Sequence, residues 1–300
     1  MAVHQTINIA YHYTSIDIFL KMLNGVKDNL IFFHGSYISY MNDPTEFKYG
    51  FNFVHKLLEP IENELLVQRD DRLSLIWNTD DIREQHIDML TETFQLPFVV
   101  CFSNHKDFLP QWEMYGDRGK GVSLGFDVQN YCKVYKTKDG QKILDMTKYN
   151  DKEPHALRVS YRNICNRPFI KSALYSMYKN YLEEIKTCRD KEAKCKLQLD
   201  VLHSIAFYLS ALIKHKAYSY ESETRILLSR SKYNDVLFKT NNKGQIVPYI
   251  NIAIDLKRLK KIVIGPCCCE YDTTKMMIGA RLKQLNHKDV KILRSQIPYR

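Results

Sequence analysis

The chain has 300 residues, of which 45% are hydrophobic and 12% aromatic. This composition is rich enough in apolar residues to bury a core, and it excludes a disordered or fibrous chain. Lys and Arg number 44 against 34 Asp and Glu, which gives a formal net charge of +10. Such a surplus favours an anionic partner such as nucleic acid or a nucleotide, or serves only to keep the chain soluble.

The eight cysteines are scattered, except for the run Cys267, Cys268 and Cys269. Their spacing is not that of a secreted disulfide framework, and no two Cys-x2-Cys pairs offer a zinc site. The N-terminus lacks the pattern of a signal peptide, and polar residues interrupt the longest apolar stretch, Val201 to Ile213. We therefore expect free thiols, no bound metal, no membrane span and a cytoplasmic location.

The first third of the chain predicts strands and helices with clear boundaries. Ile7 to Tyr13 predicts a strand, and Ser15 predicts the N-cap of a helix that ends at Gly25. Pro44 is expected in the first turn of a further helix that Pro60 interrupts. Further strands are expected at Leu30 to His34, Pro97 to Phe102 and Gly121 to Phe126, with a hairpin over 134–144.

The second half begins with a long helical section, Phe169 to Ile213, which predicts two antiparallel helices. After it we expect a strand at Thr224 to Ser229, a hairpin around Asn241 to Gly244, a strand at Ile262 to Ile264, a helix near Thr273 to Leu285 and a strand at Val290 to Leu293. No repeat or linker divides the chain. We predict one α+β domain over residues 1–300, with a mixed or antiparallel central sheet and helical insertions at about 44–93 and 169–214.

Polar side chains gather at the expected ends of these elements, where core packing does not require them. In a late strand Glu221 and Glu223 would share one face, with Arg225 as the third member of the row. Two neighbouring carboxylates repel, so the pKa of one should rise or a cation should lie between them. The other candidates are His12, Tyr13, Thr14, Asn42, Asp43, Glu46, Ser103, Trp112 and Tyr115.

Several common enzyme signatures are absent from the sequence. There is no phosphate-binding P-loop, no dinucleotide fingerprint, no Gly-x-Ser-x-Gly elbow and no His-Glu-x-x-His helix. Each candidate residue also has a plain structural interpretation. His12 could cap a strand, Asp43 and Glu46 could cap a helix, and the row at Glu221 could be a surface salt-bridge ladder.

Six short blocks together resemble a bacterial family of unknown function, whose members occur alone or beside defence genes. The blocks are His12-Tyr13-Thr14-Ser15, Asn42-Asp43-Pro44-x-Glu46, Phe102-Ser103, Trp112-x-x-Tyr115-Gly116, Gly121 to Asp127 and Glu221-x-Glu223-x-Arg225. They span most of the chain.

More distantly, the chain is similar to ADP-ribosyltransferases, including toxins that modify nucleic acid. The similarity lies in a first strand that ends in His-x-Thr, a helix closed by glycine and a late strand that carries glutamate. It implies an ADP-ribosyltransferase-like fold with NAD as substrate, bound around His12, Tyr13, Thr14 and Ser103. By this resemblance His12 anchors the ribose, Glu223 stabilises the oxocarbenium-like centre, and Glu221 precedes it by two residues. The aromatic ring that stacks on nicotinamide is left open among Tyr115, Trp112, Tyr37 and Tyr40.

The leading hypothesis is an NAD-using ADP-ribosyltransferase or NAD glycohydrolase, in the setting of a bacterial defence effector or toxin. On this hypothesis Glu223→Gln abolishes turnover and leaves the fold nearly intact. One alternative is a non-catalytic module that binds nucleotides or nucleic acid. Another is a metal-dependent nuclease built on Asp43, Glu46, Glu221 and Glu223 with Lys214 or Lys216. Convergence of His12 and Glu223 in one pocket would favour the transferase, whereas a carboxylate cluster without His12 would favour the nuclease.

Overall fold

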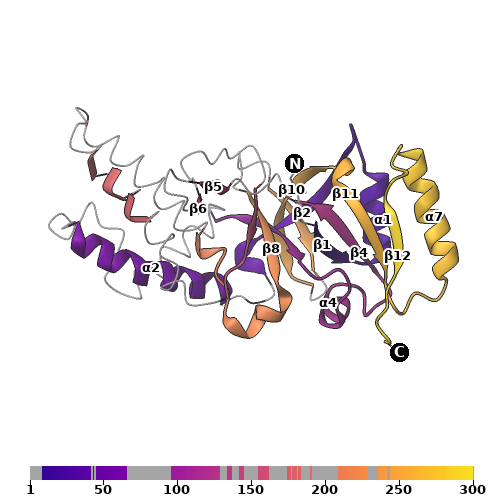
Figure 1. Ribbon diagram of the computed structural model, residues 1–300, viewed down its shortest axis with the longest axis horizontal. Coiled ribbons are helices and arrows are strands. Elements are labelled where there is room, and N and C mark those ends of the chain that lie inside the picture. The colour runs from indigo at the N-terminus through magenta and orange to yellow at the C-terminus, as the bar shows by residue number, and fades with distance from the viewer. Residues whose placement is uncertain are drawn as a thin grey trace, which may run out of the picture.

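A computed structural model describes residues 9–41, 43, 45–65, 96–128, 134–136, 142–144, 155–161, 174–176, 178–180, 182–183, 190, 209–228, 236–241 and 244–299. The chain has an α+β fold, in which helices flank an open ten-stranded sheet (Figure 1). The sheet is antiparallel except for one parallel pair, β11 with β12. Among the described helices, none combines the length and the apolar character that a membrane crossing requires.

Eight strands follow one path, β12-β11-β4-β1-β3-β2-β10-β9, and β8 and β7 branch from it at β3. A separate two-stranded hairpin, β5 with β6, lies over the residues where the sequence predicts it. The strands are β1 (Ile9–Thr14), β2 (Leu30–Tyr37), β3 (Phe98–Ser103), β4 (Val122–Asp127), β5 (Val134–Lys136), β6 (Lys142–Leu144), β7 (His155–Arg158), β8 (Glu223–Leu228), β9 (Leu237–Thr240), β10 (Ile246–Asp255), β11 (Leu259–Ile264) and β12 (Lys291–Arg294).

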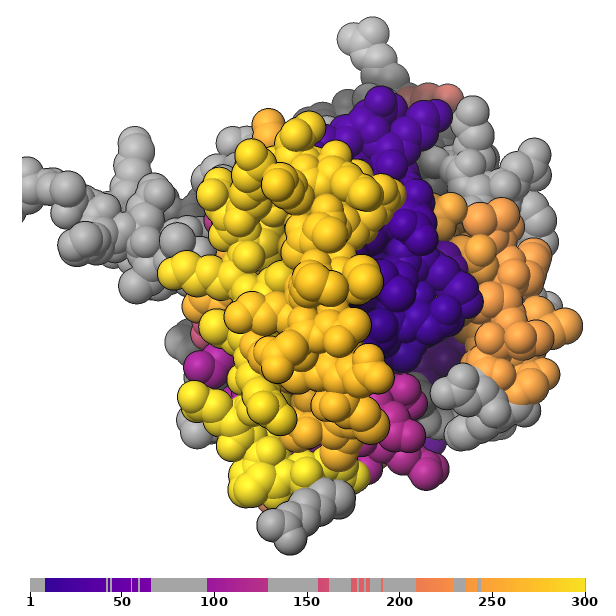
Figure 2. Space-filling view, turned by 90° about the vertical axis from the view of Figure 1, so that its right-hand side faces the viewer, coloured from indigo at the N-terminus to yellow at the C-terminus, as the bar shows by residue number. Residues whose placement is uncertain are grey.

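The main helices are α1 (Ile16–Asn24), α2 (Glu46–Glu64), α4 (Leu109–Met114) and α7 (Tyr271–Gln284), with the 3-10 helix η6 (Lys216–Glu221) before β8. Helix α1 has the predicted caps, because the Ser15 hydroxyl accepts the Ile18 amide and Gly25 ends the helix. Helices α1 and α7 pack side by side (Figure 2), where Arg281 donates to the Leu23 carbonyl.

The prediction that Pro60 interrupts α2 is wrong, since the helix continues to Glu64. Apolar residues on both sides of Pro60, Leu58 and Ile61 among them, are buried against Leu174 and Tyr178. Burial of several such side chains stabilises the helix by more than one lost backbone hydrogen bond costs.

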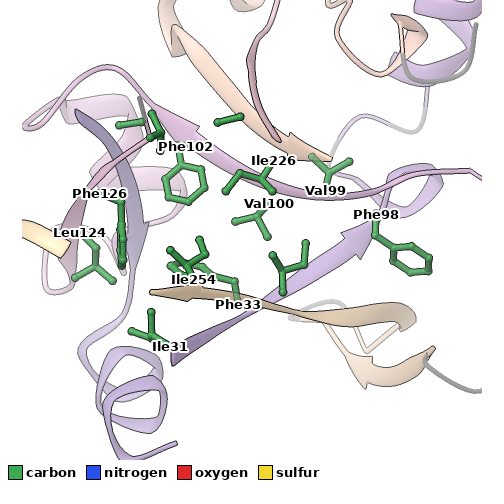
Figure 3. Packing of buried hydrophobic residues seen from close by; sticks show 14 of the residues in the cluster. Ile31, Phe33, Phe98, Val99, Val100, Phe102, Leu124, Phe126, Ile226 and Ile254 are labelled. Carbon is green, nitrogen blue, oxygen red and sulfur yellow. The ribbon is translucent and has the colours of Figure 1, made fainter. Parts of the chain in front are cut away.

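Strand β3 belongs to both halves of the sheet. One of its edges pairs with β8 along the full length. The other edge is divided, because β1 pairs near Ser103 and β2 pairs near Phe98. Strands β1 and β2 therefore diverge, and we call the space between them the fork. Buried side chains from β2, β3, β4, β8 and β10, including Phe33, Phe102 and Phe126, fill it (Figure 3).

Candidate active site

Five charged side chains meet beside β8 and form what we call the ionic cluster: Glu46, Lys214, Glu221, Glu223 and Arg225. They come from the first turn of α2, the segment 209–215, the end of η6 and β8. No member has more than 8% of its side chain exposed, and Arg225 is fully buried. Charged groups are buried in this way only when they are paired.

Lys214 lies between the three carboxylates of the cluster. Its Nζ is 2.6 Å from Oε2 of Glu221, 3.1 Å from Oε2 of Glu46 and 3.3 Å from Oε2 of Glu223. A single ammonium thus binds all three glutamates. Of the two outcomes that the sequence analysis left open for Glu221 and Glu223, a shifted pKa or a cation between them, the structure shows the cation.

Arg225 holds the other side of the cluster. Its Nε donates to Oε1 of Glu223 at 2.9 Å, and its Nη2 donates to Oε2 at 3.0 Å, a bidentate contact. Nη2 also contacts Glu46, and Nη1 donates to the Ala211 carbonyl at 2.6 Å. The guanidinium therefore fixes the carboxylate of Glu223 against α2 and the segment that carries Lys214.

The turn between the two catalytic candidates is held by the end of β3. Glu221 is the last residue of η6 and not part of the strand, and Ser222 has a left-handed backbone with φ of 44°. The Ser103 hydroxyl donates to the Glu221 carbonyl at 2.7 Å. The Asn104 amide donates to the Ser222 carbonyl, and its side chain donates to the Ser222 hydroxyl. These contacts maintain a strained turn that directs both glutamates toward Lys214.

The two glutamates titrate differently. Burial alone would raise the pKa of Glu223, but Arg225 and Lys214 outweigh it and hold this pKa at about 2. Burial raises the pKa of Glu221 above its usual value, and Lys214 offsets only part of this effect. Three carboxylates against two cations leave one net negative charge, which disappears when Glu221 takes a proton. The cluster therefore contains one permanent carboxylate and one that accepts protons more readily.

The strand register places His12 and Glu223 on opposite faces of the sheet. Tyr11 lies opposite Ser103, and Ser103 lies opposite Glu223. Directly opposite residues project to the same face and neighbours along a strand alternate, so His12 projects away from Glu223. One strand separates β1 from β8, which sets their backbones about 10 Å apart. The two residues do not converge as the sequence hypothesis required.

His12 lies in the fork instead. Its Nδ1 is 2.9 Å from the Cys101 carbonyl, at the point where β1 separates from β3, and its ring packs against Phe33 and Phe102. Burial and the charge of Lys239 lower its pKa, although the contact with Cys101 opposes them. The His12 ring therefore provides a hydrogen-bond partner for the Cys101 carbonyl, because the backbone of β1 no longer pairs with β3 at this position. Thr14, two residues on, is also buried.

The remaining polar candidates have separate surroundings. Asp43 accepts the amide and hydroxyl of Thr45 just before α2 and makes no contact with the ionic cluster. Asn42 lies outside the described residues. Lys216 is exposed on η6, so Lys214 and not Lys216 joins the carboxylates.

Burial separates the aromatic candidates into two groups. Trp112 is fully buried, packs against Tyr13 and donates to Asp107, and Tyr37 is also fully buried. Neither ring can stack on a ligand. Tyr40 and Tyr115 are exposed.

A group of aromatic residues that the sequence analysis missed lies around the ionic cluster, and we call it the aromatic rim. Tyr218 lies 5.0 Å from the Lys214 ammonium, and Tyr220 directly precedes Glu221 and is exposed. Tyr49 follows Glu46 by three residues on α2, and its ring lies 5.5 Å from that of His215. The signal for the rim was a tyrosine within four residues of each of Glu46, Lys214 and Glu221.

The donor set does not fit a metal ion. Among the described residues, no group of three His, Cys, Asp or Glu side chains has a metal-binding arrangement. In the ionic cluster the space between the carboxylates is taken by the Lys214 ammonium. A cation there would have to displace a positive charge that three glutamates already bind.

Residues 111–226 match the model of a family described as a protein of unknown function (DUF2971). No curated protein and no solved structure matches the chain. The matched segment contains Lys214, Glu221, Glu223 and Arg225, whereas Glu46 and Ser103 lie before it. The site is therefore shared between the matched segment and the part of the chain that precedes it.

Proposed function

We propose that this chain is an NAD-using enzyme of the ADP-ribosyltransferase type, which transfers ADP-ribose to an acceptor or hydrolyses NAD. The observation that carries the proposal is the pair Glu221 and Glu223, held by one lysine and given opposite pKa shifts. Most enzymes that cleave glycosidic bonds use such a pair, one carboxylate that stays ionised and one that handles a proton.

Each glutamate then has a distinct role. When the bond between nicotinamide and ribose breaks, its electron pair leaves with nicotinamide, and positive charge develops on the ribose. The ionised Glu223 stabilises that charge. Glu221 accepts the proton of the attacking water or acceptor, because a raised pKa makes a carboxylate a better base near neutral pH. Arg225 and Lys214 hold both carboxylates in place before the reaction.

The rest of the site supports a cationic substrate group. The net negative charge of the ionic cluster attracts the positively charged nicotinamide ring, and the aromatic rim offers rings on which it can stack. Tyr218 and Tyr220 replace Trp112 and Tyr37 as candidates. His12 has no part in this version of the proposal, because it projects to the other face.

The metal-dependent nuclease is the alternative whose residues Glu46, Glu221, Glu223 and Lys214 do come together, and a carboxylate cluster without His12 is the outcome that the sequence analysis assigned to it. Its remaining carboxylate, Asp43, binds Thr45 instead. We do not adopt it, because the Lys214 ammonium occupies the position that a metal ion would need. No step is therefore assigned to a metal.

The proposal is tested by incubating the purified protein with NAD labelled in the ribose and in the nicotinamide. Parallel reactions contain RNA, DNA, a protein lysate or no acceptor. We expect release of nicotinamide, with label transferred to one acceptor or left as free ADP-ribose. Release at the background rate in every reaction would contradict the proposal. Cleavage of RNA or DNA without NAD would favour a nuclease.

A further inference from the structure

A second group of polar side chains lies on β2, β10 and β9, which are two to four strand positions away from β8 in the order β8-β3-β2-β10-β9. It consists of Lys239, Tyr249 and His34, and we call it the lysine 239 group. The Lys239 ammonium lies 5.4 Å from the centre of the Tyr249 ring, and the rings of Tyr249 and His34 are 4.2 Å apart. The three side chains thus form one continuous stack across three strands.

Among the described residues, the three strands that carry this group place no carboxylate near Lys239. Asp255 is the only carboxylate among the residues of β2, β9 and β10, and it is bound by Asn29. It lies six residues beyond Tyr249, about 20 Å along an extended strand. Within the described residues, the side chains of Lys239, Tyr249 and His34 make no hydrogen bond or ion pair.

The surroundings of Lys239 make this charge unusual. The lysine is half-buried, and burial lowers its pKa. Its charge also contributes to the lowered pKa of His34 and of His12, although burial is the larger cause for both. Burying the charge of a lysine without an acidic partner costs free energy, and this cost grows as more of the side chain is removed from water. An anion bound at this position would supply an acidic partner for Lys239. It would also offset the repulsion between the Lys239 charge and the protonated forms of His34 and His12.

We propose that the lysine 239 group binds a phosphate group of an anionic ligand. Lys239 supplies the charge, the Tyr249 hydroxyl and a ring nitrogen of His34 supply hydrogen-bond donors, and Asn251, paired with His34 in the register, offers an exposed amide beside them. The formal net charge of +10 draws such ligands toward the surface. The inference is independent of the chemistry proposed at Glu223.

The matched variants are Lys239→Met and Lys275→Met. Methionine removes the charge and keeps an apolar stem of similar length. Lys275 is a suitable control because its ammonium also lies over a tyrosine ring, that of Tyr271, at 5.9 Å. Inorganic pyrophosphate is titrated into each protein by calorimetry at low salt. We expect Lys239→Met to weaken binding at least tenfold and Lys275→Met to leave it unchanged.

The source of the phosphate is distinguished by a second titration with a single-stranded oligonucleotide of eight nucleotides. If the group recognises a nucleic-acid backbone, the oligonucleotide binds more tightly than pyrophosphate. The slope of log affinity against log salt then falls by about one in Lys239→Met. If it recognises a free nucleotide, the oligonucleotide has no advantage.

The wild-type protein provides a readout that does not depend on the variants folding. Pyrophosphate should shift the ring resonances of His34 in an NMR spectrum and raise the pKa of this histidine. Failure of wild-type protein to bind either probe at millimolar concentration would overturn the proposal. Equal binding by Lys239→Met and wild type would overturn it as well.

Discussion

The residues Glu221 and Glu223 differ in pKa although they share Lys214, because only Glu223 also has Arg225. Arg225 is completely buried and cannot lose its proton, so the carboxylate beside it stays ionised. Glu221 is buried with one cation that it must share with two other carboxylates. A permanent charge and a proton acceptor therefore lie two positions apart in the sequence.

Replacing Glu223 with glutamine tests its role in both activity and stability. The amide keeps the shape but loses the charge, so we expect the rate of nicotinamide release to fall by roughly a hundredfold or more. From the contacts of Glu223 we now expect the substitution to lower stability as well, which the sequence alone did not indicate. Arg225 would lose its bidentate carboxylate, and breaking such a buried pair costs about 3 kcal/mol of unfolding free energy.

The control for this variant is Asp17→Asn, which removes a carboxylate from an exposed pair with Lys21. Exposed pairs contribute less than about 1 kcal/mol, so activity and stability should stay near the wild type. Urea denaturation and nicotinamide release are measured on all three proteins. A Glu223→Gln variant with wild-type release would contradict the assigned role.

Acid should destabilise the protein through Glu223. Its pKa of about 2 in the folded chain lies below the usual 4.5, so its contribution to stability is present above pH 4.5. That contribution, about 3 kcal/mol, is lost as the pH falls toward 2. The raised pKa of Glu221 acts in the opposite direction at higher pH. Urea denaturation from pH 5 to pH 2 should show a steeper loss of stability in wild type than in Glu223→Gln, and parallel curves would contradict the pairing.

A charged site at Glu221, Glu223 and Arg225 could be predicted from the sequence, because two carboxylates so close together require a counter-charge or a shifted pKa. Glu46 was a candidate from its position at the start of a helix, but only the nuclease alternative grouped it with Glu221 and Glu223. Its link to Arg225 joins positions 179 apart, which no local pattern encodes. The role of His12 was not predictable, since shifting a strand boundary by one residue exchanges the two faces.

Among the elements, α2 reaches the ionic cluster because it approaches the segment 209–215 very closely at Gly50. A Cβ atom at Gly50 would lie 2.1 Å from the Ser210 carbonyl oxygen, a contact with backbone that only movement of the helix can relieve. Glu46 lies one turn before Gly50, and Lys214 follows Ser210 by four residues. This glycine therefore sets the distance between Glu46 and its two cations.

Gly50→Ala should lower the unfolding free energy by about 2 kcal/mol or more and reduce nicotinamide release, because α2 must move away from Lys214. Gly279→Ala in α7 is the matched control, since its new Cβ would meet only Ile292 at 3.8 Å. Alanine favours a helix over glycine, so this control should gain up to about 1 kcal/mol. Thermal unfolding is measured for both variants. Equal changes in their unfolding free energies would show that the close contact between α2 and Ser210 at Gly50 does not matter for stability.

Most elements were predictable because their signals are local. The Ser15 cap, Gly25 and the short apolar segments of β3 and β4 gave boundaries within two residues. Helix α4 was missed, since six residues provide too little periodicity. The effect of Pro60 on α2 was overestimated, because the residues that pack against this part of the helix, Leu174 among them, are more than 100 positions away in the sequence. The predicted helices over 169–213 lie largely outside the described residues.

For the whole molecule, the sharing of β3 between both halves predicts an uneven distribution of stability. Strand β3 is paired on both edges and most of its residues are buried, whereas β9 and β12 lie at the edges of the sheet. Hydrogen exchange measured by mass spectrometry should therefore be slowest in β3 and fastest in β9 and β12. If β3 exchanged as fast as the edge strands, its central position would not make it the most stable part of the sheet.

The pairing of β3 with β8 also has a consequence for how the chain acquires its site. Ser103 and Glu221 are 118 positions apart, and Glu46 precedes Arg225 by 179. Closing such distant segments is slow, so the charged groups come together late in folding. During synthesis the ribosome releases Glu46 and Ser103 long before Lys214 exists. An activity that depends on all of them is therefore silent in every unfinished chain.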